Sequence, residues 1–249
     1  MGAAAETRLS HVVGGERSRL NKARKILAVL GAAVPAQAGT LLDIGTGSGW
    51  MAHHLAKAAG LSVVGVDVAD QREVREGFIF RVVQGAALPF ESGSFDLVVS
   101  NHVVEHVGDL DAQRLHFAEI ARVLKRDGTV YFAVPNKWSL TEPHYRLPLL
   151  SWLPPEWASR YVRATKRGTW YDCRPLGPLE IRQLIREAGF VGEDRAAQAL
   201  LEMIRIEWPA KAWLLPLLQP AVRHLGPLMG LLSPTQIFVL KRVGQGLAR

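Results

Sequence analysis

Short apolar stretches alternate with amphipathic ones along most of the chain. Runs rich in Val, Leu and Ile predict buried strands, and the segments between them predict helices. The predicted strands cover residues 40–44, 61–67, 78–83, 95–100 and 129–134, with a further strand from about 190 and a last one at 235–243. The predicted helices cover residues 17–30, 50–59, 111–125 and 178–188. This alternation is typical of a doubly wound, mostly parallel α/β sheet with helices on both faces.

Two segments depart from this alternation. Residues 137–175 hold four of the seven Trp, three of the four Tyr and five Pro, which predicts an inserted lid rich in aromatic and proline residues. Residues 208–232 are apolar and contain Pro216, Pro220 and Pro227, so we expect broken amphipathic pieces there. We expect a single domain over residues 1–249 with both segments as insertions.

The amino-acid composition is typical of a globular protein. With 249 residues, 48% hydrophobic and 21% charged, the chain suits one large globular α/β domain. Its only cysteine is Cys173, which excludes an intramolecular disulfide and a cysteine-rich metal site and fits a reducing compartment. The start of the chain has neither a secretory leader nor an N-myristoylation signal, and no apolar run reaches the roughly 18 residues of a membrane span. We therefore expect a cytoplasmic protein.

The formal net charge of +7 does not by itself select a partner. A basic surface attracts nucleic acid, anionic lipid or an anionic substrate. The same excess is equally typical of a genome with arginine-rich usage. No appended RNA-binding module is visible, so nucleic acid is the less favoured partner.

A glycine-rich loop follows the first predicted strand. It reads Leu-Leu-Asp-Ile-Gly-Thr-Gly-Ser-Gly over residues 41–49, and glycines there let the backbone turn tightly and let a ligand approach. The next strand ends in Asp67, about 20 residues further on, a spacing that suits a ribose diol. A dinucleotide fingerprint would read G-x-G-x-x-G, and its pyrophosphate would be repelled by Asp43. A carboxylate at that position attracts an amino group instead, which favours S-adenosylmethionine as the cofactor.

With these motifs in place, residues 40 to about 136 resemble the class I S-adenosylmethionine-dependent methyltransferases, in particular the small-molecule methyltransferase type 11-like family. The matching stretches are LLDIGTGSG (41–49), VVGVDV (63–68), LPFESGSFDLVVSNHVVEHV (88–107) and RVLKRDGTVYFAVPN (122–136). The resemblance implies a seven-stranded Rossmann-like sheet whose last strand, residues 235–243, is antiparallel.

The resemblance also implies a set of cofactor-binding residues. The methionine end would lie at the glycine loop, Asp67 would bind the ribose hydroxyls and Val68 would pack on the adenine. Relatives offer an acid to the adenine amino group where this chain has Gln84, whose side-chain oxygen could accept the same hydrogen bond. The full predicted set is Asp43, Gly45, Thr46, Gly47, Gly49, Asp67, Val68, Gln84, Gly85, Ala86 and Asn101.

The segment after the fourth strand supplies the candidate chemistry. His102 and His106 lie four residues apart, so on a helical turn they share a face, and one of them is a candidate general base. Two alternatives stay open: that Glu105 and His106 bind a divalent metal, as a similar pair does in the quinone O-methyltransferases that this core also resembles, or that they only cap and pack. His144 in the inserted segment is the fourth candidate. We predict His102, Glu105, His106 and His144 as catalytic residues and no metal.

Other candidates receive no catalytic role. His11, His53, His54 and His116 are assigned to surface or packing positions, and nothing around Cys173 indicates a lowered thiol pKa.

The leading hypothesis is methyl transfer to a small or lipid-linked acceptor, at oxygen. The alternatives are an RNA methyltransferase, an NAD-dependent oxidoreductase and a non-catalytic cofactor-binding protein. The apolar residues 208–232 either contact the inner face of a membrane peripherally or are buried as a lid or dimer face, and burial is slightly favoured. The sequence determines neither the acceptor nor the oligomeric state.

Overall fold

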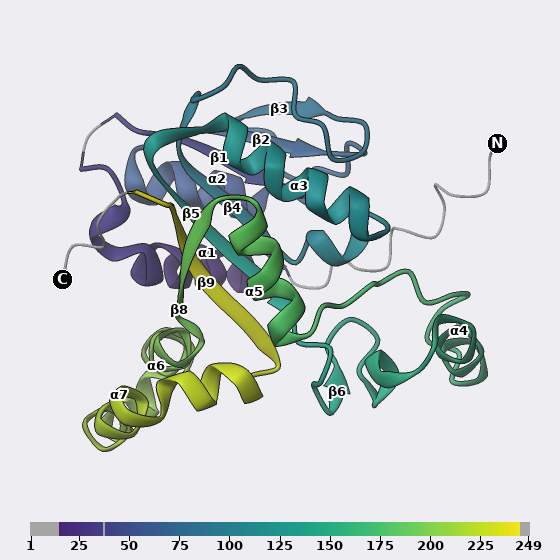
Figure 1. Ribbon diagram of the computed structural model, residues 1–249. Coiled ribbons are helices and arrows are strands. Elements are labelled where there is room, and N and C mark those ends of the chain that lie inside the picture. Colours follow the sequence, from purple (N-terminus) through teal and green to yellow (C-terminus); the bar gives the residue numbers. More distant parts are fainter. Residues whose placement is uncertain (1–14, 37, 245–249) are drawn as a thin grey trace.

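A seven-stranded sheet forms the centre of the computed structural model, which describes residues 15–36 and 38–244 (Figure 1). Predictions that fall on the first 14 residues, His11 included, lie outside the described residues. The sheet runs in the order β3-β2-β1-β4-β5-β9-β8. Its strands are β1 (Thr40–Ile44), β2 (Ser62–Asp67), β3 (Ile79–Val82), β4 (Phe95–Asn101), β5 (Leu124–Pro135), β8 (Phe190–Asp194) and β9 (Thr235–Arg242).

The strand directions confirm the doubly wound prediction. Strands β3, β2, β1, β4 and β5 are parallel, and β9 lies antiparallel between β5 and β8. The chain order reverses between β1 and β4, and ligands in such sheets bind at the carboxyl ends of the strands near that point.

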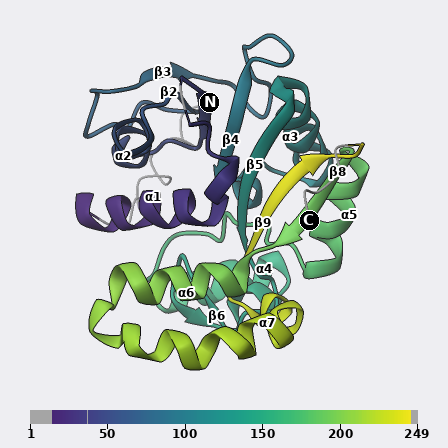
Figure 2. The same cartoon turned by 90° about the vertical axis from the view of Figure 1, so that its left-hand side faces the viewer.

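Helices cover both faces of the sheet, as Figure 2 shows from the side. One face carries α1 (Glu16–Leu30) and α2 (Trp50–Ala59), and the other carries α3 (Leu110–Val123) and α5 (Pro178–Glu187). Each helix buries its apolar stripe against the Val- and Leu-rich strands, and each fully buried Leu or Val stabilises the fold by about 1.5–3 kcal/mol.

Three elements differ from the sequence-based expectation. Strand β5 begins five residues earlier than predicted, and its pairing with β4 is irregular between the Phe95–Leu124 and Leu97–Thr129 pairs. Strand β3 is an edge strand, so its side chains stay largely exposed, Ile79 at 62%. Helix α6 (Ala196–Glu207), which follows β8, was not predicted at all.

The two unusual segments each fold into a small unit. Residues 137–175 contain β6 (Thr141–Glu142), β7 (Leu147–Pro148), the short 3-10 helix η4 (Leu150–Trp152) and α4 (Pro155–Ala164). They have a core of their own, made by Tyr145, Leu147, Leu150, Ala158, Val162 and Cys173.

After α6, the chain forms the 3-10 helix η5 (Pro209–Leu214) and helix α7 (Leu215–Leu232). The prediction of broken pieces is wrong for residues 215–232, because one helix runs through Pro220 and Pro227. Each proline removes one backbone donor, which leaves a carbonyl one turn earlier without its helical partner but does not end the helix. Within the described ranges, no helix is both long and apolar enough to cross a bilayer.

Asn136 ties the two segments to the same end of the sheet. Residue 137 follows the end of β5, and Pro135 pairs with Thr235 at the start of β9. The Asn136 side chain donates to the carbonyl oxygens of Leu231 (2.9 Å) and Ser233 (3.0 Å). Both segments therefore project from the edge of the sheet at which β1, β4 and β5 end.

Candidate active site

The glycine loop leaves β1 in a conformation that few other residues tolerate. Gly45 and Gly47 have φ of +76° and +56°, and a Cβ on Gly45 would lie 2.5 Å from a Val103 methyl group. The amide of Gly47 donates to Asp67 Oδ2 at 2.8 Å, which joins the loop to the end of β2. The two predicted cofactor-binding motifs are thus in direct contact.

A cavity of about 730 Å³ opens beside this loop. That volume lies in the range of small-molecule sites. Its wall includes most of the predicted cofactor-binding residues: Gly45, Thr46, Gly47, Asp67, Val68, Gln84, Gly85, Ala86 and Asn101. The same cavity continues to His102, His106 and His144. The structure therefore brings the two predicted groups of residues to one site.

Asp43 lies beneath the loop rather than on the cavity wall. Its side chain is completely buried, and neither carboxylate oxygen makes a hydrogen bond within the described part of the chain. Burial raises its pKa to about 7, with Asp67 adding to the rise and with Thr46 and Arg19 opposing it. A buried carboxylate without a hydrogen-bond partner beside a cradle of bare backbone fits a ligand with a cationic amino group.

Asp67 faces the cavity with its oxygens held by backbone amides. Oδ2 accepts from Gly47 and Oδ1 accepts from Val68 N at 2.7 Å. A carboxylate has about four lone-pair sites, so each oxygen can still accept from a ligand hydroxyl. Val68 is 42% exposed next to it, which leaves an apolar surface free for a flat ring.

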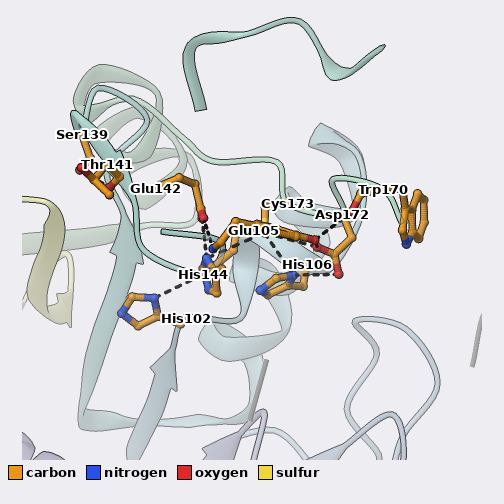
Figure 3. A network of polar contacts seen from close by, with 11 residues as sticks. His102, Glu105, His106, Ser139, Thr141, Glu142, His144, Trp170, Asp172 and Cys173 are labelled. Carbon is orange, nitrogen blue, oxygen red and sulfur yellow. Dashed lines mark hydrogen bonds and ion pairs between the residues drawn. The ribbon is translucent and has the colours of Figure 1, made fainter. Parts of the chain in front are cut away.

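The histidine cluster lies at the end of β4, as Figure 3 shows. His102 has a φ of +59°, a costly conformation for a residue other than glycine, and its amide donates to Ala133 of β5 at 2.9 Å. Glu105 lies in the short 3-10 helix η3 (Val104–His106) and is fully buried. Its Oε1 is 3.5 Å from His102 Nδ1 and 3.6 Å from His144 Nε2.

The inserted segment completes this cluster. His144 Nδ1 lies 2.7 Å from Glu142 Oε1, and the Tyr145 amide donates to the other Glu142 oxygen at 2.6 Å. Asp172 accepts a hydrogen bond from the Tyr145 hydroxyl at 2.8 Å and lies 4.0 Å from His106 Nδ1. Residues far apart in the sequence thus meet over the cavity.

Burial and neighbouring charges shift the pKa values of His102, His144 and Glu105 in different directions. Burial lowers the pKa of His102 despite the opposing Glu105 carboxylate, so this imidazole is neutral at pH 7. Burial also acts to lower the pKa of His144, but Glu142, Glu105 and Asp172 outweigh it and raise that pKa. Burial would raise the pKa of Glu105, but the three histidines outweigh it and keep the group ionised.

Three residues of the cavity wall were missed or assigned elsewhere by sequence reasoning. Arg19 and Lys22 of α1 reach the cavity, and burial lowers the pKa of Lys22 to about 8. Their i, i+3 spacing in the basic half of that helix was a usable signal. His116 also lines the cavity, bonded to Ser100 Oγ at 3.0 Å, and burial lowers its pKa to about 4. Of the predicted residues, Gly49 and Glu105, like Asp43, lie behind the wall.

Cys173 lies close to the cluster without the properties of a nucleophile. Its sulfur is 3.8 Å from His106 Nδ1 and 3.9 Å from His144 Nδ1. Burial and the nearby Asp172 carboxylate raise its pKa well above the usual value, which keeps the thiol protonated. His102, Glu105 and His144 offer donor atoms within 4.8 Å of one another, so the prediction that no metal binds stays a prediction.

Comparison with known proteins shows which sequences this chain is similar to. Residues 42–132 match the sequence model of the family described as a methyltransferase domain. The chain is 29% identical over 179 residues to the ubiquinone biosynthesis O-methyltransferase of Chelativorans sp. (strain BNC1), a match that covers 66% of this chain and 63% of the relative. It is 33% identical over 111 residues to the malonyl-[acyl-carrier protein] O-methyltransferase of Erwinia billingiae (strain Eb661), which covers 43% of each. The chain thus spans less than two thirds of the length of these relatives.

A solved structure shares the fold. The 1,6-didemethyltoxoflavin-N1-methyltransferase of Burkholderia thailandensis, with 1,6-didemethyltoxoflavin and S-adenosylhomocysteine bound, superposes with a TM-score of 0.52. The match covers 91% of this chain and 79% of that chain at 16% sequence identity. At that identity the likeness concerns the fold alone, and it agrees with the seven-stranded sheet described above.

Proposed function

We propose that this chain is a class I S-adenosylmethionine-dependent methyltransferase and that it transfers a methyl group from that cofactor to a hydroxyl oxygen of a small or lipid-linked acceptor. One observation carries the proposal: a single cavity joins the glycine loop and Asp67 to the histidine cluster. The first part has the chemistry for a methionine and a ribose, and the second part can handle a proton.

The residues of the loop would bind the cofactor. Asp43 offers a buried carboxylate for the amino group, Asp67 offers acceptors for the ribose hydroxyls, and Val68 offers an apolar wall. Arg19, close enough to influence the pKa of Asp43, adds a cation near the methionine end. Bound S-adenosylmethionine supplies a methyl group that is already activated on a sulfonium, so alignment provides much of the rate.

His102 is the best candidate for the general base. Its Nδ1 faces the ionised Glu105, which favours the tautomer with the proton on Nδ1 and leaves a lone pair on Nε2. A neutral imidazole on the cavity wall can take the proton of an acceptor hydroxyl as the oxygen attacks the methyl group. Glu105 acts as a positioning residue that stabilises the resulting imidazolium, by the logic of a carboxylate–histidine pair.

His144 has a complementary role. It is held between Glu142 and Glu105, whose carboxylates raise its pKa, and it lines the acceptor end of the cavity. We assign it to binding an oxygen of the acceptor and to closing the site against water. His106, near Asp172, lines the same wall and positions the acceptor.

The names of two relatives support the proposed class of acceptor. Both curated relatives described above are named O-methyltransferases, one in ubiquinone biosynthesis and one acting on malonyl-[acyl-carrier protein]. A cavity of about 730 Å³ shared with the cofactor leaves room for a small acceptor or for the head of a lipid-linked one. We place the enzyme in the cytoplasm, with peripheral contact to the inner face of the membrane.

The direct test is incubation of the purified protein with methyl-labelled S-adenosylmethionine and a small-molecule and lipid extract of the host, followed by mass analysis. The proposal expects a labelled product whose methyl group sits on oxygen. Label on a nitrogen or carbon atom would contradict the O-methylation part. Label recovered only in RNA would favour the alternative RNA methyltransferase.

A further inference from the structure

The exposed apolar side chains are concentrated in two segments. Of the 21 large hydrophobic side chains that the described part of the chain leaves exposed, seven lie in residues 138–170 and seven in residues 208–232. We call these fourteen the aromatic face, because they include six of the seven tryptophans. They are Trp138, Leu140, Leu149, Trp152, Leu153, Trp157, Trp170, Trp208, Trp213, Leu217, Leu225, Leu228, Leu231 and Leu232. For residues 208–232, both alternatives from the sequence, a peripheral membrane contact and burial as a lid or dimer face, stay predictions.

The two segments lie at one end of the molecule. Asn136 holds both segments to the ends of β5 and β9. Its side chain donates to Leu231 O, and its backbone N–H donates to Pro234 O at 2.9 Å. In Figures 1 and 2, β6 and helices α4, α6 and α7 all lie at the lower end, and β3 lies at the opposite end. The exposed leucines and tryptophans therefore belong to one end of the protein and are not scattered over it.

The charges around this face are predominantly positive. Exposed basic side chains in the two segments are Arg146, Arg160, Arg163, Lys166, Arg167, Lys211 and Arg223. The exposed acidic side chain is Glu156, and Glu142 is buried. Residues 208–234 contain no acidic residue. A basic and aromatic surface complements an anionic one.

We propose that the aromatic face docks on an anionic lipid bilayer. Tryptophan combines an apolar ring with a polar N–H and collects at the level of the headgroups, while leucines reach the acyl boundary. Each basic residue near the surface of an anionic leaflet adds about 1 kcal/mol, or about fivefold in partitioning. The docking would be peripheral, with α7 lying along the surface.

Docking has a consequence for the active site that rests on the proposed function. His144 and Arg146 belong to the same inserted segment as seven of the exposed tryptophans and leucines, and both line the cavity. A docked molecule thus presents the acceptor end of its cavity near the lipid surface. A lipid-linked acceptor could then enter without its chain crossing water.

The test measures membrane binding without any need for activity. Full-length protein is mixed with vesicles of phosphatidylcholine alone or with phosphatidylglycerol added, and sedimented. We expect binding to the anionic vesicles that weakens at high salt. Because six of seven tryptophans lie on the face, brominated lipids should quench most of the intrinsic fluorescence of the bound protein.

Variants separate the contributions of charge and of apolar contact. Arg160→Glu combined with Arg163→Glu, and Trp213→Ser combined with Leu217→Ser, should each lower the vesicle partition coefficient by at least about tenfold. The controls Lys57→Glu on α2 and Ile79→Ser on β3 are single changes of the same kinds, charge reversal and apolar to serine, at exposed positions away from the face, and should bind like wild type. Thermal melting confirms that each variant is folded.

Two outcomes would overturn this proposal. One is equal sedimentation of the wild type and both face variants, or none at all. The other is a stable dimer in solution in which Trp213→Ser dissociates the subunits, since that result assigns the face to a second copy of the chain. Methyl transfer to a water-soluble acceptor, measured on the same preparations, shows separately whether the proposed function holds.

Discussion

Asp43 has an unusual position for an ionisable residue, because it is buried and neither carboxylate oxygen accepts a hydrogen bond from the residues that the structure describes. With its pKa raised to about 7, the carboxyl is partly protonated at neutral pH in the free protein. A ligand ammonium group would stabilise the ionised form and so reverse the effect of burial.

A pH dependence of cofactor binding follows from this. Binding to ionised Asp43 must first remove its proton at low pH, so affinity rises as the pH rises through 7. We expect the Kd for S-adenosylmethionine to be about tenfold lower at pH 8 than at pH 6, measured by isothermal titration. Asp43→Asn should bind weakly with a flat profile. A wild-type Kd that does not change between these pH values would refute this role.

Kinetics with an identified acceptor can test the roles of His102 as general base and of Glu105 as positioning residue. We expect His102→Ala to lower kcat by about 10²–10⁴-fold, with the Kd for the cofactor unchanged within about twofold. Glu105→Gln should lower kcat by a smaller factor, since it loses only the orientation and the charge behind the imidazole. His53→Ala on α2, a histidine that does not line the cavity, is the control.

The same assay separates a base from a metal site. If His102 acts as a base, dialysis against a chelator leaves kcat unchanged. Loss of activity that is restored by adding a divalent cation would favour the alternative in which Glu105 and His106 bind metal. Full activity of His102→Ala would remove this residue from the mechanism.

At the scale of the elements, Asn136 connects the sheet with both appended segments. Its side chain donates to Leu231 O and Ser233 O and accepts from Trp138 N at 3.0 Å, and it is 1% exposed. Removing it leaves three part-buried backbone groups without these partners, at up to about 1 kcal/mol for each.

Asn136→Ala should therefore lower the free energy of unfolding by at least about 2 kcal/mol in urea titrations. Asn136→Asp keeps the acceptor for Trp138 but loses both donors, so it separates the two contributions. Thr235→Ala, at the neighbouring start of β9, is a control with no side-chain bond of this kind. An Asn136→Ala protein as stable as wild type would show that the segments are held by other contacts.

The elements of the core were predictable because each strand and helix obeys its own local pattern. Residues 50–59 form α2 with the predicted bounds, since Gly49 and Gly60 adopt left-handed conformations at its two ends. Helix α7 was not predictable in this way: prolines indicate a break, but the packing of this segment against α6 overrides that preference.

At the scale of the whole molecule, the sequence predicted the cavity residues around the glycine loop better than those that α1 and residues 137–175 contribute. The loop and Asp67 are joined by a strand–loop–helix rule that is local, so residues 41–67 sufficed. Arg19, Lys22 and Asp172 reach the cavity only through the packing of α1 and of residues 137–175 on the sheet. The i, i+3 spacing of Arg19 and Lys22 places them on one helix face, but the sequence does not show that this face meets the cavity.

The arrangement also explains why the exposed surface is uneven. The sheet and its helices bury their apolar residues, whereas the two appended segments keep theirs exposed at the end where the cavity opens. The proposed docking on a lipid surface would account for this unevenness.

The central claim is that the cavity beside residues 45–49 binds S-adenosylmethionine through Asp43 and Asp67. Isothermal titration of the purified protein with S-adenosylmethionine and, separately, with NADH tests it most directly. We predict one molecule of S-adenosylmethionine bound per chain, a loss of at least about tenfold in affinity for Asp67→Ala, and no heat with NADH. Binding of NADH without binding of S-adenosylmethionine would contradict the account.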